Sequence, residues 1–233
     1  SADLYGSDIA LLNLVKNLDK KRFSPIVCLP HSGILEQELK KANINVVVVP
    51  MPVLGRMFLN PKGIYKILKK IPLSLKIIRN IIKDKKIDII HSNTLSIFIG
   101  AIGAKLFRVK HIWHVHEIIT HPKWLSFIFP WIVWMGADKV VANSNQTASY
   151  LKSKCPFIKK KLFIILNGID NRKFKLDFEQ NFLRKRYNLP FNDIIITLIG
   201  RINRLKGQIL LLDTIPQILR ENPFTFFLMV GEP

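Results

Sequence analysis

The stretch "LIGRINRLKGQILLLDTI", residues 198–215, joins a short aliphatic run to a longer segment with helical spacing. Gly200, Arg201 and Lys206 lie between the two. A buried strand that passes through a glycine-containing loop into a helix is one βα unit, the building block of a parallel sheet. The stretch therefore predicts an α/β fold and places two cations where a strand gives way to a helix.

The same alternation of short aliphatic runs and helical patterns continues along the chain. It is typical of parallel strands that are buried on both faces of a sheet. Strands are predicted at residues 25–30, 44–50, 87–92, 111–117, 139–144, 162–168, 194–200 and 224–231. Helices are predicted at residues 7–19, 35–42, 95–107, 124–136, 145–154, 178–187 and 206–221, with a further helix that begins near Pro72.

The most polar part of the chain, residues 167–193, is interpreted as the passage between two α/β domains. We expect an N-terminal Rossmann-like domain at residues 1–172 and a linker with the start of a second domain at 173–233. Two strands and one helix are too little to bury a core alone. Because no strand pattern precedes the first helix, we also expect the sequence to be a window that lacks the first strand and most of the second domain.

The chain is strongly basic, with 36 Lys and Arg against 16 Asp and Glu and a formal net charge of +20. Such a charge favours an anionic partner: nucleic acid, acidic lipid or a phosphate-bearing substrate. Residues 61–90 alone hold nine Lys and Arg against Asp84 and Asp88. No helix-turn-helix, zinc-finger or RNA-recognition pattern is present, so the alternative of a nucleic-acid-binding module depends on charge alone, and no nucleic-acid partner is expected.

Cysteine spacing and hydropathy predict the compartment. Cys28 and Cys155 have no CxxC spacing and are interpreted as reduced thiols of a cytosolic protein. The most apolar stretch, residues 124–136, contains Pro130 and is shorter than the about 20 residues that a membrane-spanning helix needs. No transmembrane segment is predicted.

Ligands of parallel sheets bind beyond the carboxyl ends of the strands, so the residues that follow each strand are the candidates for a site. At residues 200–207, Gly200 permits close backbone approach, Arg201 offers a rigid fork of donors, and Lys206 adds a second charge near the N–H groups of a helix. This arrangement fits a diphosphate. The alternative is that both cations are ordinary solvated side chains.

Two histidines share one face of the strand predicted at residues 111–117. His114 and His116 alternate with apolar residues, which raises the possibility of zinc, but Glu117 faces the other way and no third ligand is placed by the sequence. We therefore predict no metal site. His116, at the end of the strand, has the better position to contact a substrate.

Several well-known motifs are absent from the sequence. It contains no G-x-x-x-x-G-K-[ST], no G-x-G-x-x-G and no G-x-S-x-G. Phosphate-loop NTPases, dinucleotide oxidoreductases and α/β-hydrolases therefore lose their direct support.

Seven segments, taken together and in order, resemble the retaining glycosyltransferases of family 4, also called group 1, which have the two-domain GT-B architecture. The segments are "LYGSDIALLNLVKNL" (4–18), "IDIIHSN" (87–93), "IWHVHEI" (112–118), "ADKVVANSNQTASYL" (137–151), "FIILNGIDNRKF" (163–174), "LIGRINRLKGQILLLDTI" (198–215) and "FLMVGEP" (227–233). The resemblance covers nearly the whole chain.

The resemblance implies a nucleotide-diphosphate sugar as donor and a glycan or lipid-linked molecule as acceptor, with retention of configuration and no cofactor or metal. Arg201 and Lys206, beside Gly200, would bind the donor's diphosphate, and His116 would contact the transferred sugar. The remaining positions that match the family's substrate-binding elements are Gly6, Ser7 and Ser144. The family's paired glutamates, E-x7-E, lie downstream of the last strand here, so this chain alone is expected to be inactive.

The acceptor side is predicted from two further features. The basic segment 61–90 and the aromatic-rich helix at 124–136 favour docking of a cytoplasmic protein on the anionic inner face of a membrane, in cell-surface polysaccharide synthesis. The alternative is that the aromatic helix packs in the core. Another GT-B enzyme, such as a sugar-nucleotide epimerase, remains a competing function, while the basic loop at 200–206 favours a transferase. The donor base, the sugar, the acceptor and the linkage are left open.

Overall fold

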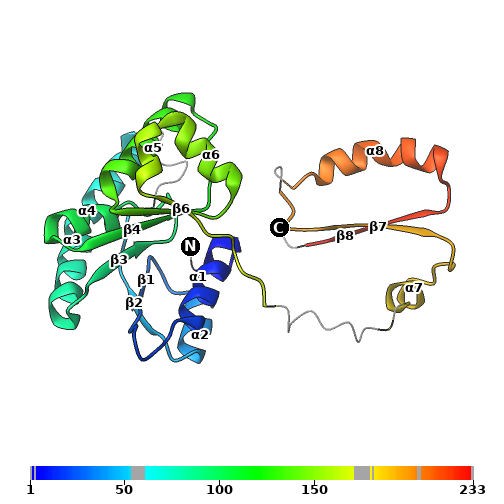
Figure 1. Cartoon of the computed structure of the whole chain (residues 1–233). Coiled ribbons are helices and arrows are strands. Elements are labelled where there is room, and N and C mark those ends of the chain that lie inside the picture. Colours follow the sequence, from blue (N-terminus) through cyan, green and yellow to red (C-terminus); the bar gives the residue numbers. More distant parts are fainter. Residues whose placement is uncertain are drawn as a thin grey trace. The chain divides into compact units, whose positions relative to one another are not determined.

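The computed structural model describes residues 2, 4–53, 61–170, 179, 181–203 and 206–231. It separates into two compact units, Ser1–Ile169 (unit 1) and Asp170–Pro233 (unit 2) (Figure 1). The predicted domain boundary between residues 172 and 173 lies outside the described residues. Each unit is described by itself below.

The strands of unit 1 are all parallel, as the short aliphatic runs predicted. One sheet pairs β1 (Ile26–Leu29) with β2 (Asn45–Val48). The other has the order β3-β4-β5-β6, formed by Ile89–Ser92, Lys110–Val115, Lys139–Ala142 and Leu162–Ile164. In this sheet Ser92 lies beside Trp113, and Trp113 beside Val140. The carboxyl ends of β3, β4 and β5 therefore lie at one edge.

One helix precedes the first strand of unit 1 and the others connect successive strands, and they bury their apolar sides against the sheets. They are α1 (Gly6–Asn17), α2 (Ile34–Lys41), α3 (Pro61–Lys85), α4 (Ile99–Phe107), α5 (Lys123–Gly136) and α6 (Asn145–Lys154), and the 3-10 turn η2 (Pro156–Lys160) follows α6. None of the described helices is both long and apolar enough to cross a membrane.

The prediction that a helix begins near Pro72 is wrong, because α3 begins at Pro61 and continues through Pro72. A proline inside a helix costs about 3 kcal/mol. The cost is offset because buried Ile67 and Ile78 lie on either side of it, so that one apolar stripe packs across the proline. The Ser74 hydroxyl lies 2.8 Å from the Lys70 carbonyl, to which it donates, and fixes the helix at this point.

The core of unit 1 forms around Trp113, in the middle of the larger sheet. Its ring is fully buried and packs edge-on against Phe129 of α5, with ring centroids 6.4 Å apart. Its indole N–H donates to the Thr94 carbonyl at 3.0 Å, so no polar atom of the side chain is left unpaired. This packing fixes the position of β4 relative to α5, and therefore the position of the residues that follow β4.

Unit 2 holds α7 (Phe182–Arg186), β7 (Ile194–Ile199), α8 (Gln208–Glu221) and β8 (Thr225–Val230). The two strands are parallel, with Ile199 beside Val230. Among the described residues of this unit only Gln208 is buried. The described residues of this unit therefore enclose no apolar core, and the predicted α/β class of the chain is confirmed.

Candidate functional site

The residues that follow β3 and β4 meet at the carboxyl edge of the larger sheet of unit 1. The Oδ1 of Asn93 lies 3.2 Å from Nε2 of His116, and the Nδ2 of Asn93 donates to the Ser7 carbonyl at 2.8 Å. A carbonyl can only accept a hydrogen bond, so its position fixes the orientation of the Asn93 amide. The amide oxygen then faces the imidazole, and His116 carries its proton on Nε2.

A second amide lies on the other side of the His116 ring. The Nδ2 of Asn143, which follows β5, is 3.5 Å from Nδ1 of His116. Its Oδ1 accepts from the Thr147 hydroxyl at 3.0 Å, and the Thr147 N–H donates to the Ser144 hydroxyl at 3.1 Å. Ser144 is therefore the N-cap of α6. The Nδ1 lone pair of His116 points toward the Asn143 donor, in agreement with the Nε2 tautomer.

One network thus contains three of the four residues that the sequence singled out in this part of the chain. Ser7, His116 and Ser144 are linked through the amides of Asn93 and Asn143. The fourth residue, Gly6, is the first residue of α1 and precedes Ser7 directly. The two asparagines had not been assigned to the site. Their position directly after a strand was the available signal.

The His116 ring also lies against a second histidine, with the two ring planes tilted by 32°. Its centroid is 4.1 Å from that of His114, which in turn lies 5.6 Å from that of His91. Burial, reinforced by His116 and His91, lowers the pKa of His114 to about 3. Burial also lowers the pKa of His116, although Glu117 and Asp8 oppose the effect. Both imidazoles are therefore neutral near pH 7.

The arrangement does not favour zinc at His114 and His116. Glu117 is turned to the loop after β3, where it accepts from the Thr94 hydroxyl and from the Leu95 N–H. Among the described residues, no group of three or more His, Cys, Asp or Glu could hold a metal ion. His114 is buried, and its Nε2 has no hydrogen-bond partner in the part of the chain that the structure describes.

The basic loop of unit 2 is held by close backbone contacts. Gly200 donates to the Val230 carbonyl at 2.9 Å, and a Cβ placed on Gly231 would lie 1.9 Å from the Gly200 oxygen, which leaves room only for glycine. The Gln208 side chain donates to the Arg201 carbonyl at 2.8 Å. The path of the chain at Gly200 and Arg201 is therefore fixed from two sides.

The loop brings Lys206 back to Gly200. A Cβ placed on Gly200 would lie 3.7 Å from Cδ of Lys206, so the alkyl stem of the lysine passes over the glycine. Gly207 then takes a left-handed conformation with φ +81°, and α8 begins at Gln208. Backbone N–H groups at the start of a helix lack intrahelical partners and favour an anion. The structure thus gathers Gly200, Lys206 and a helix N-terminus, which are three of the features expected of a diphosphate site.

The parallel sheets and the helices that cover them define the class of this protein as a GT-B type α/β protein with Rossmann-like units. The sequence model for Glycosyltransferase Family 4 matches residues 6–173, well over half of the chain. The chain belongs to this family. No curated protein sequence matches it.

Solved structures of the same fold include proteins that bind nucleotide sugars. Anabaena Alr3699/HepE, solved with UDP and glucose, is 22% identical with a TM-score of 0.73, and the match covers 100% of this chain and 59% of that one. The S. aureus MnaA complex with UDP is 18% identical with a TM-score of 0.59 and coverages of 97% and 59%. The UDP-GlcNAc 2-epimerase of Neisseria meningitidis, bound to UDP-GlcNAc, is 14% identical with a TM-score of 0.53 and coverages of 96% and 62%. This chain spans about 60% of the length of these relatives.

Proposed function

We propose that the protein transfers a sugar from a nucleoside diphosphate sugar, with UDP as the first nucleotide to test, to a glycan or lipid-linked acceptor with retention of configuration. The observation that carries the proposal is the loop at residues 200–207, where Lys206 returns to Gly200 at the start of α8. Membership of family 4 and the nucleotides bound by the structural relatives support it. We place this activity in the synthesis of cell-surface polysaccharide.

The chemistry follows from the charge that develops during transfer. The bond between the anomeric carbon and the diphosphate oxygen breaks, and the nucleoside diphosphate leaves with the bonding electrons. Arg201, Lys206 and the first N–H groups of α8 stabilise this charge, which lowers the barrier without a metal ion. The acceptor hydroxyl attacks the same face of the sugar and gives its proton to the departing diphosphate, so no protein nucleophile is needed.

The network around His116 supports a role in positioning the donor sugar. His116 is neutral, and its ring is held by the amide of Asn93 and by the contact with the His114 ring. A rigid, uncharged group contacts a sugar without competing for the diphosphate. Gly6 and Ser7, at the start of α1, would lie on the same side of the donor, because Asn93 ties the Ser7 carbonyl to His116. Ser144, the cap of α6, keeps a supporting role in this site.

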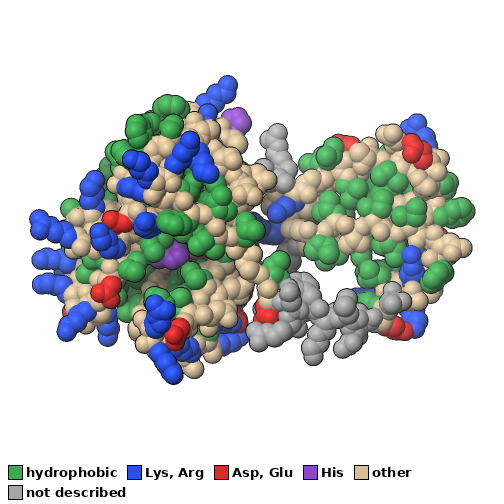
Figure 2. Space-filling view, in the orientation of Figure 1, with side chains coloured by type: hydrophobic (Ala, Val, Ile, Leu, Met, Phe, Trp, Pro, Cys, Tyr) green, Lys and Arg blue, Asp and Glu red, His purple; other side chains and the backbone are tan. Residues whose placement is uncertain are grey.

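Docking on an anionic membrane surface is the second part of the proposal. The described cations of α3 are exposed, and they alternate with exposed apolar residues, among them Tyr65, Leu68 and Leu73. Figure 2 shows Lys and Arg gathered at the left edge of unit 1, where Figure 1 places α3. A helix face that mixes lysines with aromatic and aliphatic side chains is suited to the headgroup region. We therefore propose a cytoplasmic protein that binds peripherally to the inner face of the membrane.

The sequence of the aromatic helix α5 allowed two interpretations, packing in the core and docking on a membrane, and each applies to one side of the helix. Phe129 is buried, and Trp131 and Trp134 pack against the core. Trp124 and Phe127 are exposed by 52% and 56%. One side of the helix therefore packs in the core, and the exposed side is available to support membrane docking.

A sugar-nucleotide epimerase is the alternative, because several relatives of the same fold carry that activity in their names. Incubating the whole protein with radiolabelled UDP-sugars, with and without a membrane lipid extract, separates the two. A transferase moves label into the lipid fraction and releases UDP only when an acceptor is present. Inversion of a sugar centre without any acceptor would instead establish the epimerase.

A further inference from the structure

A cavity of about 370 Å³ opens at the edge of the larger sheet that lies opposite His116. It is bounded by the last turns of α4 and α5, by the first residues of β4, and by the residues that directly precede β5 and β6. Four cations line it, Lys105, Arg108, Lys110 and Lys161, against one carboxylate, Asp138. Its volume equals that of about a dozen liquid water molecules, more than a bare phosphate requires.

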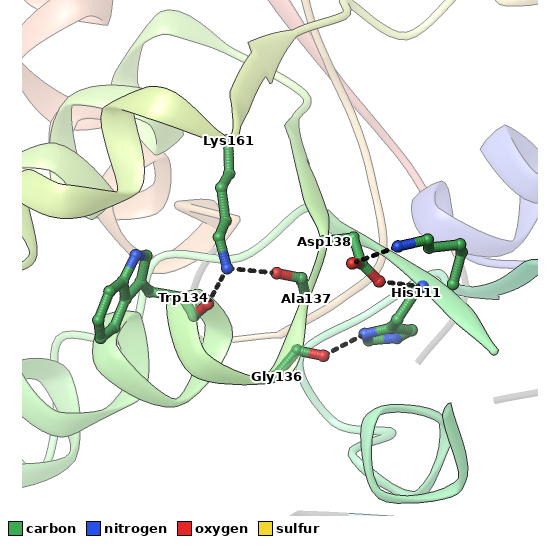
Figure 3. Close-up of polar contacts among 7 residues, drawn as sticks. His111, Trp134, Gly136, Ala137, Asp138 and Lys161 are labelled. Carbon is green, nitrogen blue, oxygen red and sulfur yellow. Dashed lines mark hydrogen bonds and ion pairs between the residues drawn. The ribbon is translucent and has the colours of Figure 1, made fainter. Parts of the chain in front are cut away.

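Of the two helix ends that border the cavity, that of α5 has its carbonyl groups paired by cationic and N–H donors. The carbonyls at the end of α5 would repel an anion, but Lys161 Nζ donates to those of Trp134 and Ala137 at 2.9 and 2.8 Å (Figure 3). Nδ1 of His111 donates to the Gly136 carbonyl at 2.7 Å. The negative end of this helix dipole is thus paired within the protein.

Asp138 is likewise engaged. One carboxylate oxygen accepts from the His111 N–H at 2.9 Å (Figure 3). The other lies 3.4 Å from Nζ of Lys110. The His111 N–H and, after it, Lys110 hold the pKa of Asp138 below its usual value. The carboxylate is therefore ionised, and its charge is balanced by Lys110.

Lys105 and Arg108 remain as the cations of the cavity whose side chains have neither a hydrogen-bond partner nor an acidic partner among the described residues. Both are exposed. Arg108 ends α4 in a left-handed conformation, with φ 57°, and its N–H donates to the Ala104 carbonyl. That backbone bond fixes the start of the Arg108 side chain at the cavity wall. An anion that enters meets two cations that the protein itself does not neutralise.

We propose that this cavity binds the phosphate headgroup of an anionic membrane lipid. Beside the cations, Leu106 and Met135 are exposed by 60% and 56%, and Met135 continues the exposed side of α5 that holds Trp124 and Phe127. A dissolved phosphate gains nothing from such an apolar rim, whereas the acyl chains of a lipid do. The site rests on the proposed docking of unit 1 on a membrane and gives that docking a specific ligand.

Cations in the last turn of a helix also stabilise the helix by themselves. This purely structural role of Lys105 and Arg108 predicts a loss of stability, but no loss of ligand binding, when they are neutralised. The two roles are therefore separated by measuring binding and melting temperature on the same variants.

The test is a titration of the whole protein with water-soluble dihexanoyl phosphatidylglycerol, followed by the amide NMR signals of Val109 and Gly136 in the cavity wall. We expect saturable shifts, no comparable shifts with dihexanoyl phosphatidylcholine, and at least tenfold weaker binding by the K105Q/R108Q variant. The matched control K20Q/K21Q removes the same charge from exposed lysines outside the cavity and should change the affinity less than twofold. If the double variant melts early, R108Q alone is titrated and should still weaken binding severalfold.

Equal shifts with the choline lipid, or unchanged affinity in a folded R108Q variant, would overturn the headgroup site. Inorganic phosphate that saturates the same signals with equal affinity would overturn the assignment to a lipid. UDP binding is measured on the same samples. Normal UDP binding without lipid binding would reject this site alone, whereas lipid binding without UDP binding would reject the sugar-transfer proposal and leave the headgroup site supported.

Discussion

Replacing Asn93 by aspartate puts a negative charge beside Nε2 of His116 without changing the size of the side chain. At the observed 3.2 Å, a carboxylate and an imidazolium attract each other by about 5 kcal/mol at an effective dielectric constant of 20, before further screening by solvent. Carboxylates in such contacts shift a neighbour's pKa by about 1 to 3 units. We therefore expect N93D to raise the pKa of His116 by about that amount, against the lowering that burial causes in the native protein.

The assay is an NMR titration of the imidazole signals of His116 between pH 4 and 9. The native protein should also show the Nε2-protonated tautomer, which follows from the bond of Asn93 to the Ser7 carbonyl. N17D adds the same charge on the exposed end of α1 and should leave the pKa of His116 unchanged. An unaltered pKa in a folded N93D protein, or the Nδ1 tautomer in the native protein, would refute the hydrogen-bond reasoning.

Three further predictions concern stability and the basic loop. Trp113→Ala should lower the free energy of unfolding by about 3 to 5 kcal/mol because it empties the centre of the core, as measured by urea denaturation with circular dichroism; a loss below 1 kcal/mol would count against this core. Gly231→Ala should weaken UDP binding at least tenfold in calorimetry, because its Cβ would displace the Gly200 carbonyl, whereas Gly168→Ala, whose Cβ meets nothing, should have no effect. His114 has a pKa of about 3 in the folded protein and about 6.5 when unfolded, so the unfolded chain takes up a proton first on acidification. The contribution of neutral His114 to the free energy of unfolding is complete above pH 6.5 and falls by up to about 1.4 kcal/mol per pH unit toward pH 3, which is a loss of about 2 kcal/mol at pH 5. A folded His114→Leu protein should lose that part of the pH dependence. A pH profile identical to that of the native protein would contradict the assignment.

The strands and the order of the loops could be predicted from the sequence, because β-branched runs and helical periodicity are local signals. The eight strands lie where the runs indicated. Packing between distant segments could not be predicted in the same way. At Pro72 the local rule for proline predicts a helix start, but burial of Ile67 and Ile78 on both sides extends the helix through it.

In the candidate site, too, local positions could be predicted from the sequence, but contacts between distant segments could not. Position after a strand pointed to His116 and the family resemblance pointed to Ser7, yet only the distances show that Asn93 joins them and sets the tautomer. The close approach of the Gly200 carbonyl to Gly231 depends on the register of β7 and β8, which cannot be predicted from the sequence. The cavity that holds Arg108 and Lys161 depends on helices and strands that meet only in the folded sheet, and for that reason no motif marks it.

Calorimetric titration of the protein with UDP and with uridine tests the central claim, that Arg201 and Lys206 bind the diphosphate of the donor. Hydrogen bonds to charged groups contribute about 1.5 to 3 kcal/mol, so R201A and K206A should each weaken UDP binding about tenfold or more and leave uridine binding unchanged. R186A removes a cation from α7 of the same unit and serves as the control. Equal affinity for UDP in the native protein and in both loop variants would contradict the account.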